Sequence, residues 1–310
     1  MEKMRIYYRA SSHVPLWKVM EHGGFLERHG AAMDFGSMEG MRGKAMQGLR
    51  AGEIDIVSGN HHNLYVRRAR HNEPFVHLAQ PNNQWRENCL VAGDGVGGLA
   101  DLKGKRVVMD DFDGHTGLNV WLYLRLNGLE EGRDVELVEG PKDARERVRG
   151  VMSGEYGATF VRAVDKLRAR ALGATLIDVP PMAMIEGVTL TTTTTYVDGH
   201  PEEVRALIRA LVDAVHFFKT HREETLAIIK THCGDKYETD EELAAFYDEQ
   251  VLTLEPKPYP TLDAIRNVFA LAVRRHPEVE GFNPLAMWDL HYLREIDDSG
   301  YIDGVWRGSG

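Results

Sequence analysis

The sequence predicts an α/β protein of two lobes, each built around a β-sheet with parallel strands. Short apolar runs alternate with amphipathic segments along the chain, which is the pattern of βα units. The chain has 310 residues, of which 43% are hydrophobic, and this exceeds the usual size of a single hydrophobic core. Two lobes are therefore expected.

Six of the apolar runs are predicted to be strands. They are Arg5–Tyr8, Ile54–Ser58, Arg106–Met109, Val135–Val138, Ala158–Val161 and Thr175–Val179. Thr191–Thr195 is predicted to be an extended strand that crosses between the lobes, because threonine loses side-chain freedom in a helix but fits a pleated strand.

Helices are predicted between the strands. Pro15 suits the first position of a helix, where a missing N–H costs little. The apolar residues between Val204 and Phe218 recur with the 3.6-residue period of a long amphipathic helix. Two further helices are predicted, one that carries Met41, Ala45 and Leu49 and one over Asn119–Leu126.

The charge of the chain favours a small-molecule partner. The formal net charge at pH 7 is −10, whereas proteins that bind nucleic acid or acidic membranes concentrate lysine and arginine. No nucleic-acid partner is therefore expected. Cys89 and Cys233 are the two cysteines of the sequence, which gives neither a disulfide framework nor the spacing of a structural zinc site.

No membrane insertion is expected, and the predicted location is the cytoplasm. No apolar stretch approaches the roughly 18 residues of a membrane span. Met4–Tyr8 already belongs to the first strand, where a signal peptide would begin its apolar run. A periplasmic location would follow if a signal peptide had been removed.

Three stretches together resemble type 2 periplasmic solute-binding proteins of the sulfonate, nitrate and thiamine-precursor group. The three stretches are Pro15–Gly30, which ends in GGFLERHG, Leu49–Ile56 and Ala100–Val107. The DSGYID sequence of Asp298–Asp303 is also similar to these proteins. The resemblance implies two α/β lobes around a ligand cleft, joined by two crossing strands near residues 90–93 and 188–196. Lobe 1 would then hold residues 1–92 and 191–310, and lobe 2 residues 93–190.

A narrower stretch, Leu64–Phe75 followed by Trp85 and Arg86, is similar to 4,5-dihydroxyphthalate decarboxylases, which are cytoplasmic enzymes on the same fold. Glu87 follows Arg86 where that family would have a histidine, so its catalytic groups are not transferred. A sulfinate desulfinase would need a cysteine in the loop after the first strand, and this loop contains none.

In open α/β sheets ligands bind beyond the carboxyl ends of the strands, and the segments there are polar in this sequence. These segments contain the histidines His13, His61, His62 and His115. Histidines in loops are, however, commonly exposed to solvent and without a direct function. General acids for a catalysed reaction are predicted at His61, His115, Asp111 and His13.

The predicted ligand contacts suit an anion. An arginine pairs with a carboxylate through two hydrogen bonds, a tryptophan stacks on a planar ring, and the N–H groups at a helix start hold anionic oxygens. Trp85 could equally belong to the core. The predicted contacts are Arg9, Ser11, Ser12, Asn60, His62, Asn82, Trp85, Arg86, Gly114 and Thr116.

No cofactor is required by the sequence, and a divalent metal is left open. Imidazole and carboxylate together suit zinc, iron or manganese, but the adjacent His61 and His62 would point apart in an extended loop. Arg67, Arg68 and Arg70 are expected to be mostly solvated on a helix.

Two functions follow from these observations. The first is a cytoplasmic enzyme on the binding-protein fold that acts on a small anionic carboxylic acid, with an aromatic acid and nonoxidative decarboxylation as the first guess. The alternative is a substrate-binding protein that delivers a small organic anion to an ABC permease. The fold supports both, because function is set by the site and not by the fold. A homo-oligomer is left open.

Overall fold

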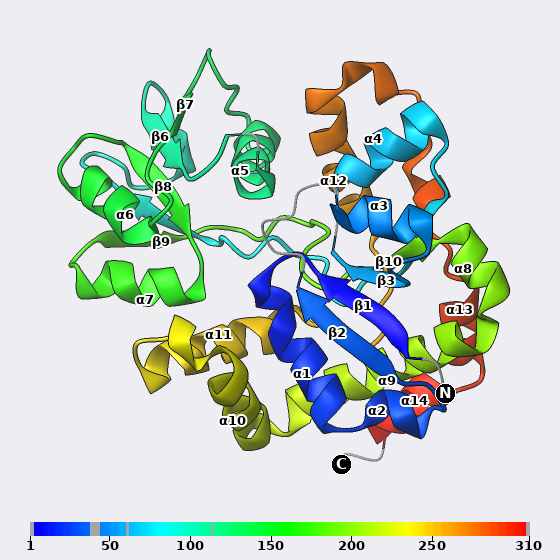
Figure 1. Ribbon diagram of the computed structural model, residues 1–310. Helices are drawn as coiled ribbons and strands as arrows, with labels where there is room; N and C mark the ends of the chain where they lie inside the picture. Colours follow the sequence, from blue (N-terminus) through cyan, green and yellow to red (C-terminus); the bar gives the residue numbers. More distant parts are fainter. Residues whose placement is uncertain (1–2, 38–43, 60–61, 113, 308–310) are drawn as a thin grey trace. The chain divides into compact units, whose positions relative to one another are not determined.

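The structure is a computed structural model that describes residues 3–37, 44–59, 62–112 and 114–307 (Figure 1). The chain divides into two compact units. The first unit comprises the residues up to Gln84 together with those from Ala183 onward, and the second unit comprises Trp85–Met182. Each unit contains a five-stranded sheet, so that the predicted α/β class and the two-part organisation are confirmed.

The sheet of the first unit is mixed. Its strand order is β2-β1-β3-β10-β4, in which β1 pairs with β2 and β3 in parallel and β10 runs antiparallel to β3 and β4. The strands are β1 (Met4–Tyr8), β2 (Met33–Ser37), β3 (Ile56–Ser58), β4 (Phe75–Ala79) and β10 (Leu190–Thr193). The last of these comes from a distant part of the chain and joins β3 to β4.

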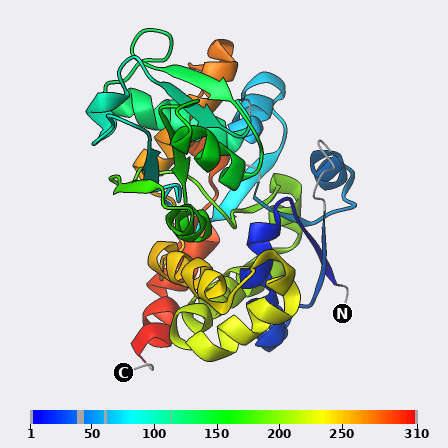
Figure 2. The ribbon, with the colours of Figure 1, turned by 90° about the vertical axis from the view of Figure 1, so that its left-hand side faces the viewer.

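Helices of the first unit bury apolar faces against this sheet and one another. The long helix predicted around Val204–Phe218 is confirmed, and α1 packs against both α9 and α10 (Figure 2). The helices are α1 (Val14–His22), α2 (Phe25–Arg28), α3 (Lys44–Ala51), α4 (His62–His71), α8 (Thr194–Gly199), α9 (Pro201–Thr220), α10 (Arg222–Cys233), α11 (Asp240–Thr253), α12 (Leu262–Arg275), α13 (His291–Asp298) and α14 (Tyr301–Arg307). Met41, which was predicted to lie on the helix now described as α3, falls outside the described residues.

The second unit has the strand order β7-β6-β8-β5-β9 and three α-helices within its described residues. Its core forms between the sheet and α6 and α7, where Val91, Val108, Val148 and Ala169 are almost fully buried. The elements are β5 (Cys89–Ala92), β6 (Arg106–Met109), α5 (His115–Leu126), β7 (Glu136–Glu139), α6 (Ala144–Met152), β8 (Ala158–Val161), α7 (Ala163–Ala171) and β9 (Thr175–Asp178).

The structure corrects the prediction that Thr191–Thr195 is one strand. The strand ends at Thr193, and α8 begins at Thr194. The Thr193 side chain accepts a hydrogen bond from the backbone N–H of Tyr196 at 3.2 Å. Threonine is a favoured residue at the start of a helix because its hydroxyl satisfies one of the unpaired first-turn N–H groups. The last two threonines are therefore helical.

The chain passes between the units at Gln84–Trp85 and at Met182–Ala183. The N–H of Trp85 donates to the carbonyl of Met182 at 2.9 Å, and Gln84 forms a bridge with Ala183. The expected crossing near residues 90–93 is instead β5, which pairs with β8 and β9 inside the second sheet. The observed boundaries thus lie earlier in the chain than those expected after residue 92 and before residue 191.

The DSGYID sequence near the carboxyl terminus forms the junction of α13 and α14. Gly300, with a φ of +77°, occupies the left-handed region that ends α13, which favours glycine. Lys257 binds Asp297 at 2.7 Å and Asp303 at 2.9 Å, one on each helix. The DSGYID segment therefore has a structural role, because it fixes α14 against the rest of the first unit.

Candidate functional site

Polar segments of the first unit meet at one edge of its sheet. Because β10 is antiparallel to β3 and β4, the strands β1, β2, β3 and β4 all end at the edge where β10 begins. The segments at this edge are Arg9–His13 after β1, the residues after Ser58, Gln80–Asn83 after β4 and Glu186–Thr189 before β10. This is the edge at which the sequence predicted ligand contacts.

His13 is buried at this edge, 5% exposed, and is held by Ser58. Its Nδ1 lies 3.2 Å from the carbonyl oxygen of Ser58 and 3.1 Å from the Ser58 hydroxyl, which also accepts a hydrogen bond from Trp17 Nε1 at 2.9 Å. A carbonyl oxygen can only accept, so its contact with Nδ1 is satisfied in the tautomer that carries the proton on Nδ1. In that tautomer Nε2 has the lone pair and can accept a proton or a hydrogen bond.

Close packing at Gly59 supports this orientation. A Cβ at Gly59, whose φ is +94°, would lie 2.7 Å from Cε1 of His13. The Gly59 carbonyl accepts a hydrogen bond from the Thr191 hydroxyl at 2.9 Å, which ties the loop after β3 to β10. The backbone therefore approaches the imidazole more closely than a side chain would permit.

Replacement of Ser58 by alanine is expected to lower the free energy of unfolding by about 1–3 kcal/mol, because it leaves the buried Trp17 N–H without its acceptor. Urea unfolding followed by tryptophan fluorescence measures this loss. Ser299→Ala is the control, since its exposed hydroxyl donates to the carbonyl of Ile296 and accepts from the N–H of Tyr301, two backbone groups at a helix junction that water also reaches. Equal losses in the two variants would contradict the proposed importance of the Trp17–Ser58–His13 chain.

The remaining predicted residues of the first unit divide into three groups. The segment after β1 and the start of α4 contain the half-buried Arg9, Ser11 and Ser12 and the buried His62. Asn82 has both ends of its amide engaged within the protein, since Nδ2 donates to Thr253 at 3.1 Å and Oδ1 accepts from the N–H of Gln84 at 3.0 Å. The predicted Asn60 and His61 lie outside the described residues.

Charged side chains of the second unit also meet at one edge of a sheet. β6 and β8 are parallel, so Asp110 after β6 and Arg162 after β8 lie at the same edge. β5 is antiparallel to β8, with Cys89 opposite Val161, so Arg86 enters the sheet at this edge as well. The sequence reasoning missed Arg162, although its position directly after the predicted strand Ala158–Val161 was a sufficient signal.

The start of α5 lies close to the loop that follows β6. The N–H of Gly114 donates to Asp111 Oδ1 at 3.0 Å, so this carboxylate caps the turn before the helix. A Cβ at Gly117 would lie 2.1 Å from the carbonyl oxygen of Asp111, and glycine is therefore required there. The N–H groups of the first turn, including that of Thr116, have no acceptor within the helix and suit an anionic oxygen.

One face of α5 carries a row of polar and aromatic side chains. His115, Asn119 and Tyr123 are four residues apart, which places them on the same side of the helix. The ring of Trp85 packs against Tyr123 with a centroid distance of 5.0 Å and against Phe160 at 5.5 Å. Trp85 is 1% exposed, so it belongs to this aromatic cluster of the second unit.

The buried polar atoms of these segments that have no hydrogen-bond partner among the described residues include Nε1 of Trp85 and Oδ1 of Asp110. A buried polar atom without a partner costs about 1–3 kcal/mol, so each is a place where a bound molecule could contribute a hydrogen bond. Together with Arg86, which is 5% exposed, they define a candidate site for a polar, negatively charged molecule.

Both cysteines are buried. Cys89 is the first residue of β5 and Cys233 is the last residue of α10. Burial raises the pKa of both thiols, which keeps them protonated and unreactive near neutral pH. The segment after β1 contains Ser11, Ser12 and His13 and no cysteine.

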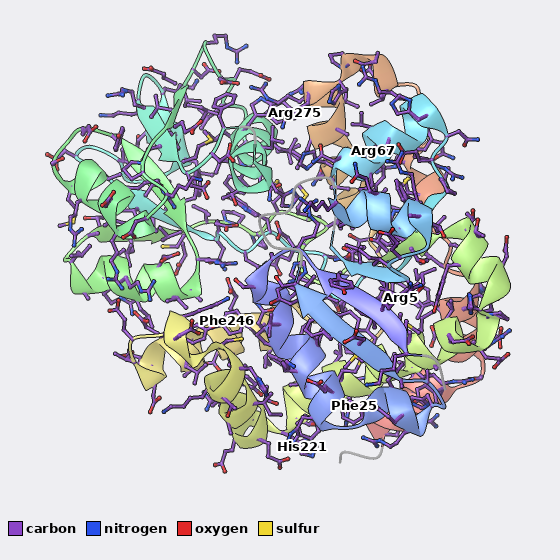
Figure 3. All side chains as sticks on the ribbon, in the orientation of Figure 1. Arg5, Phe25, Arg67, His221, Phe246 and Arg275 are labelled. Carbon is purple, nitrogen blue, oxygen red and sulfur yellow. The ribbon has the colours of Figure 1, made fainter. Side chains whose placement is uncertain are left out.

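The stretch with local resemblance to decarboxylases is engaged in contacts within the first unit. Arg67 pairs with Glu73 at 3.2 Å, Arg68 donates to the Glu73 carbonyl at 2.9 Å, and Arg70 pairs with Glu278 at 2.7 Å. The expectation that these arginines are mostly solvated holds for the exposed Arg70, whereas Arg67 and Arg68 are half-buried. Arg67, which is labelled on α4 in Figure 3, and Arg68 hold the end of α4 against the segment that leads into β4.

Among the described residues, no group of three or more histidine, cysteine, aspartate or glutamate side chains is placed to hold a metal ion. His61 and Asp113 fall outside those residues, so the divalent metal stays a prediction. Within the described parts of the chain, none of the helices combines the length and the apolar character that crossing a bilayer requires.

Comparison with solved structures shows a type 2 periplasmic-binding-protein fold. The periplasmic sulfonate-binding protein SsuA of Methylobacillus flagellatus KT has a TM-score of 0.71 at 14% identity, over 97% of this chain and 96% of that one. SsuA of Escherichia coli, a periplasmic aliphatic sulphonate-binding protein, has 0.65 at 16% identity, over 90% and 88%. The desulfurization enzyme DSZB has 0.65 at 15% identity, over 96% and 99%.

The sequence gives the family directly. Residues 12–225 match the model of the NMT1/THI5 like family, which is more than half of the chain, and the protein belongs to this family. No curated protein matches the sequence. The predicted resemblance to solute-binding proteins is thereby confirmed, whereas nothing in these comparisons supports a decarboxylase.

Proposed function

We propose that the protein is a substrate-binding protein for a small organic anion of the sulfonate or carboxylate type. The observation that carries this proposal is the convergence of Arg86, Arg162 and the start of α5 at one edge of the second sheet. Two guanidinium groups and a helix N-terminus favour a negative charge at this edge. Membership of the NMT1/THI5 like family and the likeness to two sulfonate-binding proteins support the same function.

The chemistry of the edge suggests how the anion is held. Arginine donates paired hydrogen bonds to sulfonate or carboxylate oxygens, and the first-turn N–H groups of α5 add further donors. The indole N–H of Trp85 supplies another donor from a buried position. Asp110 can only accept when ionised, so it suits a ligand that also carries an amino or hydroxyl group.

The first-unit edge carries a different kind of group. His13 contacts Ser58 through Nδ1, so Nε2 would be the atom that forms a hydrogen bond to a molecule bound at the first-unit edge. Under this function the protein partner is the permease of an ABC transporter. The location would then be periplasmic, which is the alternative that the sequence analysis left open.

The test is isothermal titration calorimetry with a panel of alkanesulfonates, aminoalkanesulfonates and aromatic carboxylates. The best ligand is expected to bind at least tenfold more weakly to Arg162→Gln and to Arg86→Gln, because a hydrogen bond to a charged group contributes about 1.5–3 kcal/mol. Arg133→Gln is the matched control in the second unit, since this exposed side chain pairs with Asp134 away from the edge.

Mass spectrometry of the same mixtures distinguishes the two functions. Binding that leaves the ligand mass unchanged supports a binding protein. Loss of carbon dioxide from a carboxylate, abolished in His13→Ala or His115→Ala, would show that the protein is a decarboxylase and would contradict the proposed function. Binding that is equally strong in the arginine variants and the wild type would refute the assignment of the binding site to the edge of the second sheet. Thermal unfolding of each variant verifies that it is folded.

A further inference from the structure

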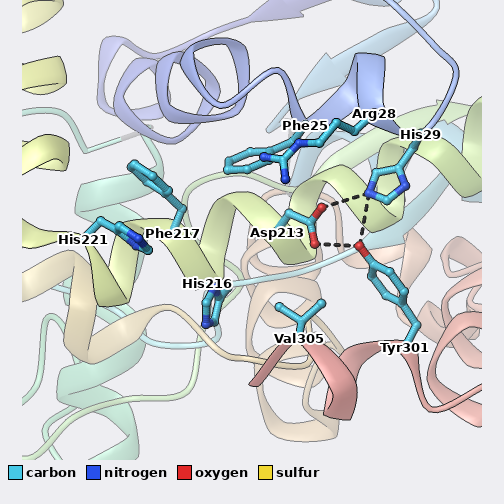
Figure 4. A pocket seen from close by; sticks show the side chains of 9 residues that line it. All are labelled: Phe25, Arg28, His29, Asp213, His216, Phe217, His221, Tyr301 and Val305. Atoms are coloured by element: carbon cyan, nitrogen blue, oxygen red, sulfur yellow. Dashed lines mark hydrogen bonds and ion pairs between the residues drawn. The ribbon is translucent and has the colours of Figure 1, made fainter. Parts of the chain in front are cut away.

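A separate pocket lies among helices of the first unit (Figure 4). It has a volume of about 510 Å³ and is formed by α2, one face of α9 and α14. His29, in its wall, lies just before β2, and β1 and β2 both begin nearby, since the N–H of Met4 donates to the carbonyl of Ala32. The pocket therefore adjoins the amino ends of these strands, whereas the candidate site of this unit lies at the carboxyl ends.

The helical spacing explains how the wall forms. Asp213, Phe217 and His221 follow one another at intervals of four residues and thus project from the same side of α9 and its end. Tyr301 and Val305 have the same spacing on α14. Figure 4 shows Asp213 directed toward His29 and Tyr301, and Phe217 beside His221, with Phe25 and Arg28 of α2 above them.

The only carboxylate among the lining residues of this pocket is hydrogen-bonded to two neighbours. One oxygen of Asp213 contacts His29 Nε2 at 2.9 Å, and the other accepts a hydrogen bond from the Tyr301 hydroxyl at 2.6 Å. The Tyr301 hydroxyl also lies 3.1 Å from His29 Nε2, so that the three side chains form one polar cluster. Asp213 is thus held within the wall and opposes an incoming anion less than a free carboxylate would.

The permanent cation of the wall is Arg28. Its guanidinium lies 4.3 Å from the centroid of the Phe25 ring and donates to the carbonyl of Gly23 at 2.9 Å, which fixes its position. Burial lowers the pKa of His216, so this imidazole is a neutral hydrogen-bonding group at pH 7. Arg28 is therefore the group of the wall that can pair with an anionic ligand.

The surfaces of the wall are flat and aromatic. The rings of Phe217 and His221 are stacked with a centroid distance of 4.3 Å and an interplanar angle of 2°. Phe25 meets Phe217 edge to face, with centroids 5.8 Å apart. Aromatic faces favour a planar ring in offset-stacked or edge-to-face contact, and an adjacent arginine favours a carboxylate on that ring.

We propose that this pocket is a second ligand site, which binds a small aromatic carboxylate independently of the sheet edges. Its volume falls within the range of about 300–1,000 Å³ that is typical of small-molecule sites. The ring would lie against the aromatic wall and the carboxylate would face Arg28. The polar cluster of His29, Asp213 and Tyr301 would hold α2, α9 and α14 at the spacing the ligand needs.

The experiment is a titration with 2-naphthoate, followed by ligand-observed NMR and by calorimetry, and compared with the uncharged 2-naphthalenemethanol. Saturable binding of the carboxylate is expected, with at least tenfold weaker binding of the alcohol. Arg28→Gln should weaken 2-naphthoate binding about tenfold, which corresponds to the loss of one charge-assisted contact. Val305→Trp should abolish it by filling the pocket while the charge is retained.

Arg294→Gln is the control, because this exposed arginine lies on α13 and pairs with Asp298 outside the pocket. Arg86→Gln and Arg162→Gln should leave this binding unchanged, so failure of the second site and failure of the proposed function give different results. Absence of saturable 2-naphthoate binding by the wild type overturns the proposal. Equal binding by the wild type and by folded Arg28→Gln and Val305→Trp variants would also overturn it.

Discussion

Replacement of Trp85 by alanine is expected to lower the free energy of unfolding by about 3–5 kcal/mol. The side chain is 1% exposed and is packed between Tyr123 and Phe160, so its removal leaves a large cavity in the second unit. Because the two units can unfold separately, hydrogen exchange is the suitable measurement. Amides of β5, β8 and α5 should lose protection, while those of β1 and β3 should not.

The conservative variant Trp85→Phe separates packing from ligand contact. Phenylalanine retains an aromatic ring but lacks the buried N–H, which has no partner among the described residues. Stability should therefore change by less than about 1.5 kcal/mol, whereas binding of the anion should weaken if the N–H donates to it. Trp306→Phe, on α14 of the first unit, is the control. An alanine variant as stable as the wild type would contradict the packing argument.

Replacement of His77 by phenylalanine should make the protein more resistant to acid. Burial lowers the pKa of His77 to about 3, while the same group in the unfolded chain titrates near 6.5. The unfolded state therefore binds the proton first as the pH falls, and the wild type loses about 1.4 kcal/mol of stability per pH unit between about 6.5 and 3 from this group. Above pH 7 the contribution vanishes, because His77 is neutral in both states.

The surroundings of His77 make phenylalanine a suitable replacement. The imidazole lies beside Trp288 with a centroid distance of 4.8 Å, and its Nδ1 contacts the Thr191 hydroxyl at 2.9 Å. That hydroxyl keeps a partner in the variant, since it also donates to the carbonyl of Gly59. Urea unfolding at several pH values measures the difference from wild type. His200→Gln, which replaces an exposed histidine, is the control. If the free energy of unfolding depends on pH in the same way for His77→Phe and the wild type, His77 is not the cause of the acid sensitivity.

Local patterns predicted most of the fold. Arg106–Met109 and Ala158–Val161 were predicted with the bounds that the structure has, because continuous apolar runs identify buried strands. β2 was missed, since its sequence MDFGS contains few apolar residues and lies at the edge of a sheet. β5 was predicted as a crossing segment, because a short apolar run does not reveal which strands it will pair with.

The candidate site was predictable in place but not in detail. The rule that ligands bind beyond the carboxyl ends of strands located the segments after β1 and β6. It could not show that the Asn82 side-chain amide donates a hydrogen bond to Thr253, because that contact joins residues far apart in the sequence. The same rule could not show whether Trp85 contacts a ligand or belongs to the hydrophobic core. Packing between residues far apart in the sequence decides this.

The position of β10 has a consequence for synthesis on the ribosome. β4 pairs only with β10 in the described sheet, and β10 follows it after the whole of the second unit has been made. At typical rates of elongation, β4 remains without its neighbouring strand for roughly 5–20 seconds, while the second unit emerges as one uninterrupted stretch. The second unit can therefore finish folding first, and the nascent amino-terminal segment, with its unpaired strand edge, is the part that most needs protection by chaperones.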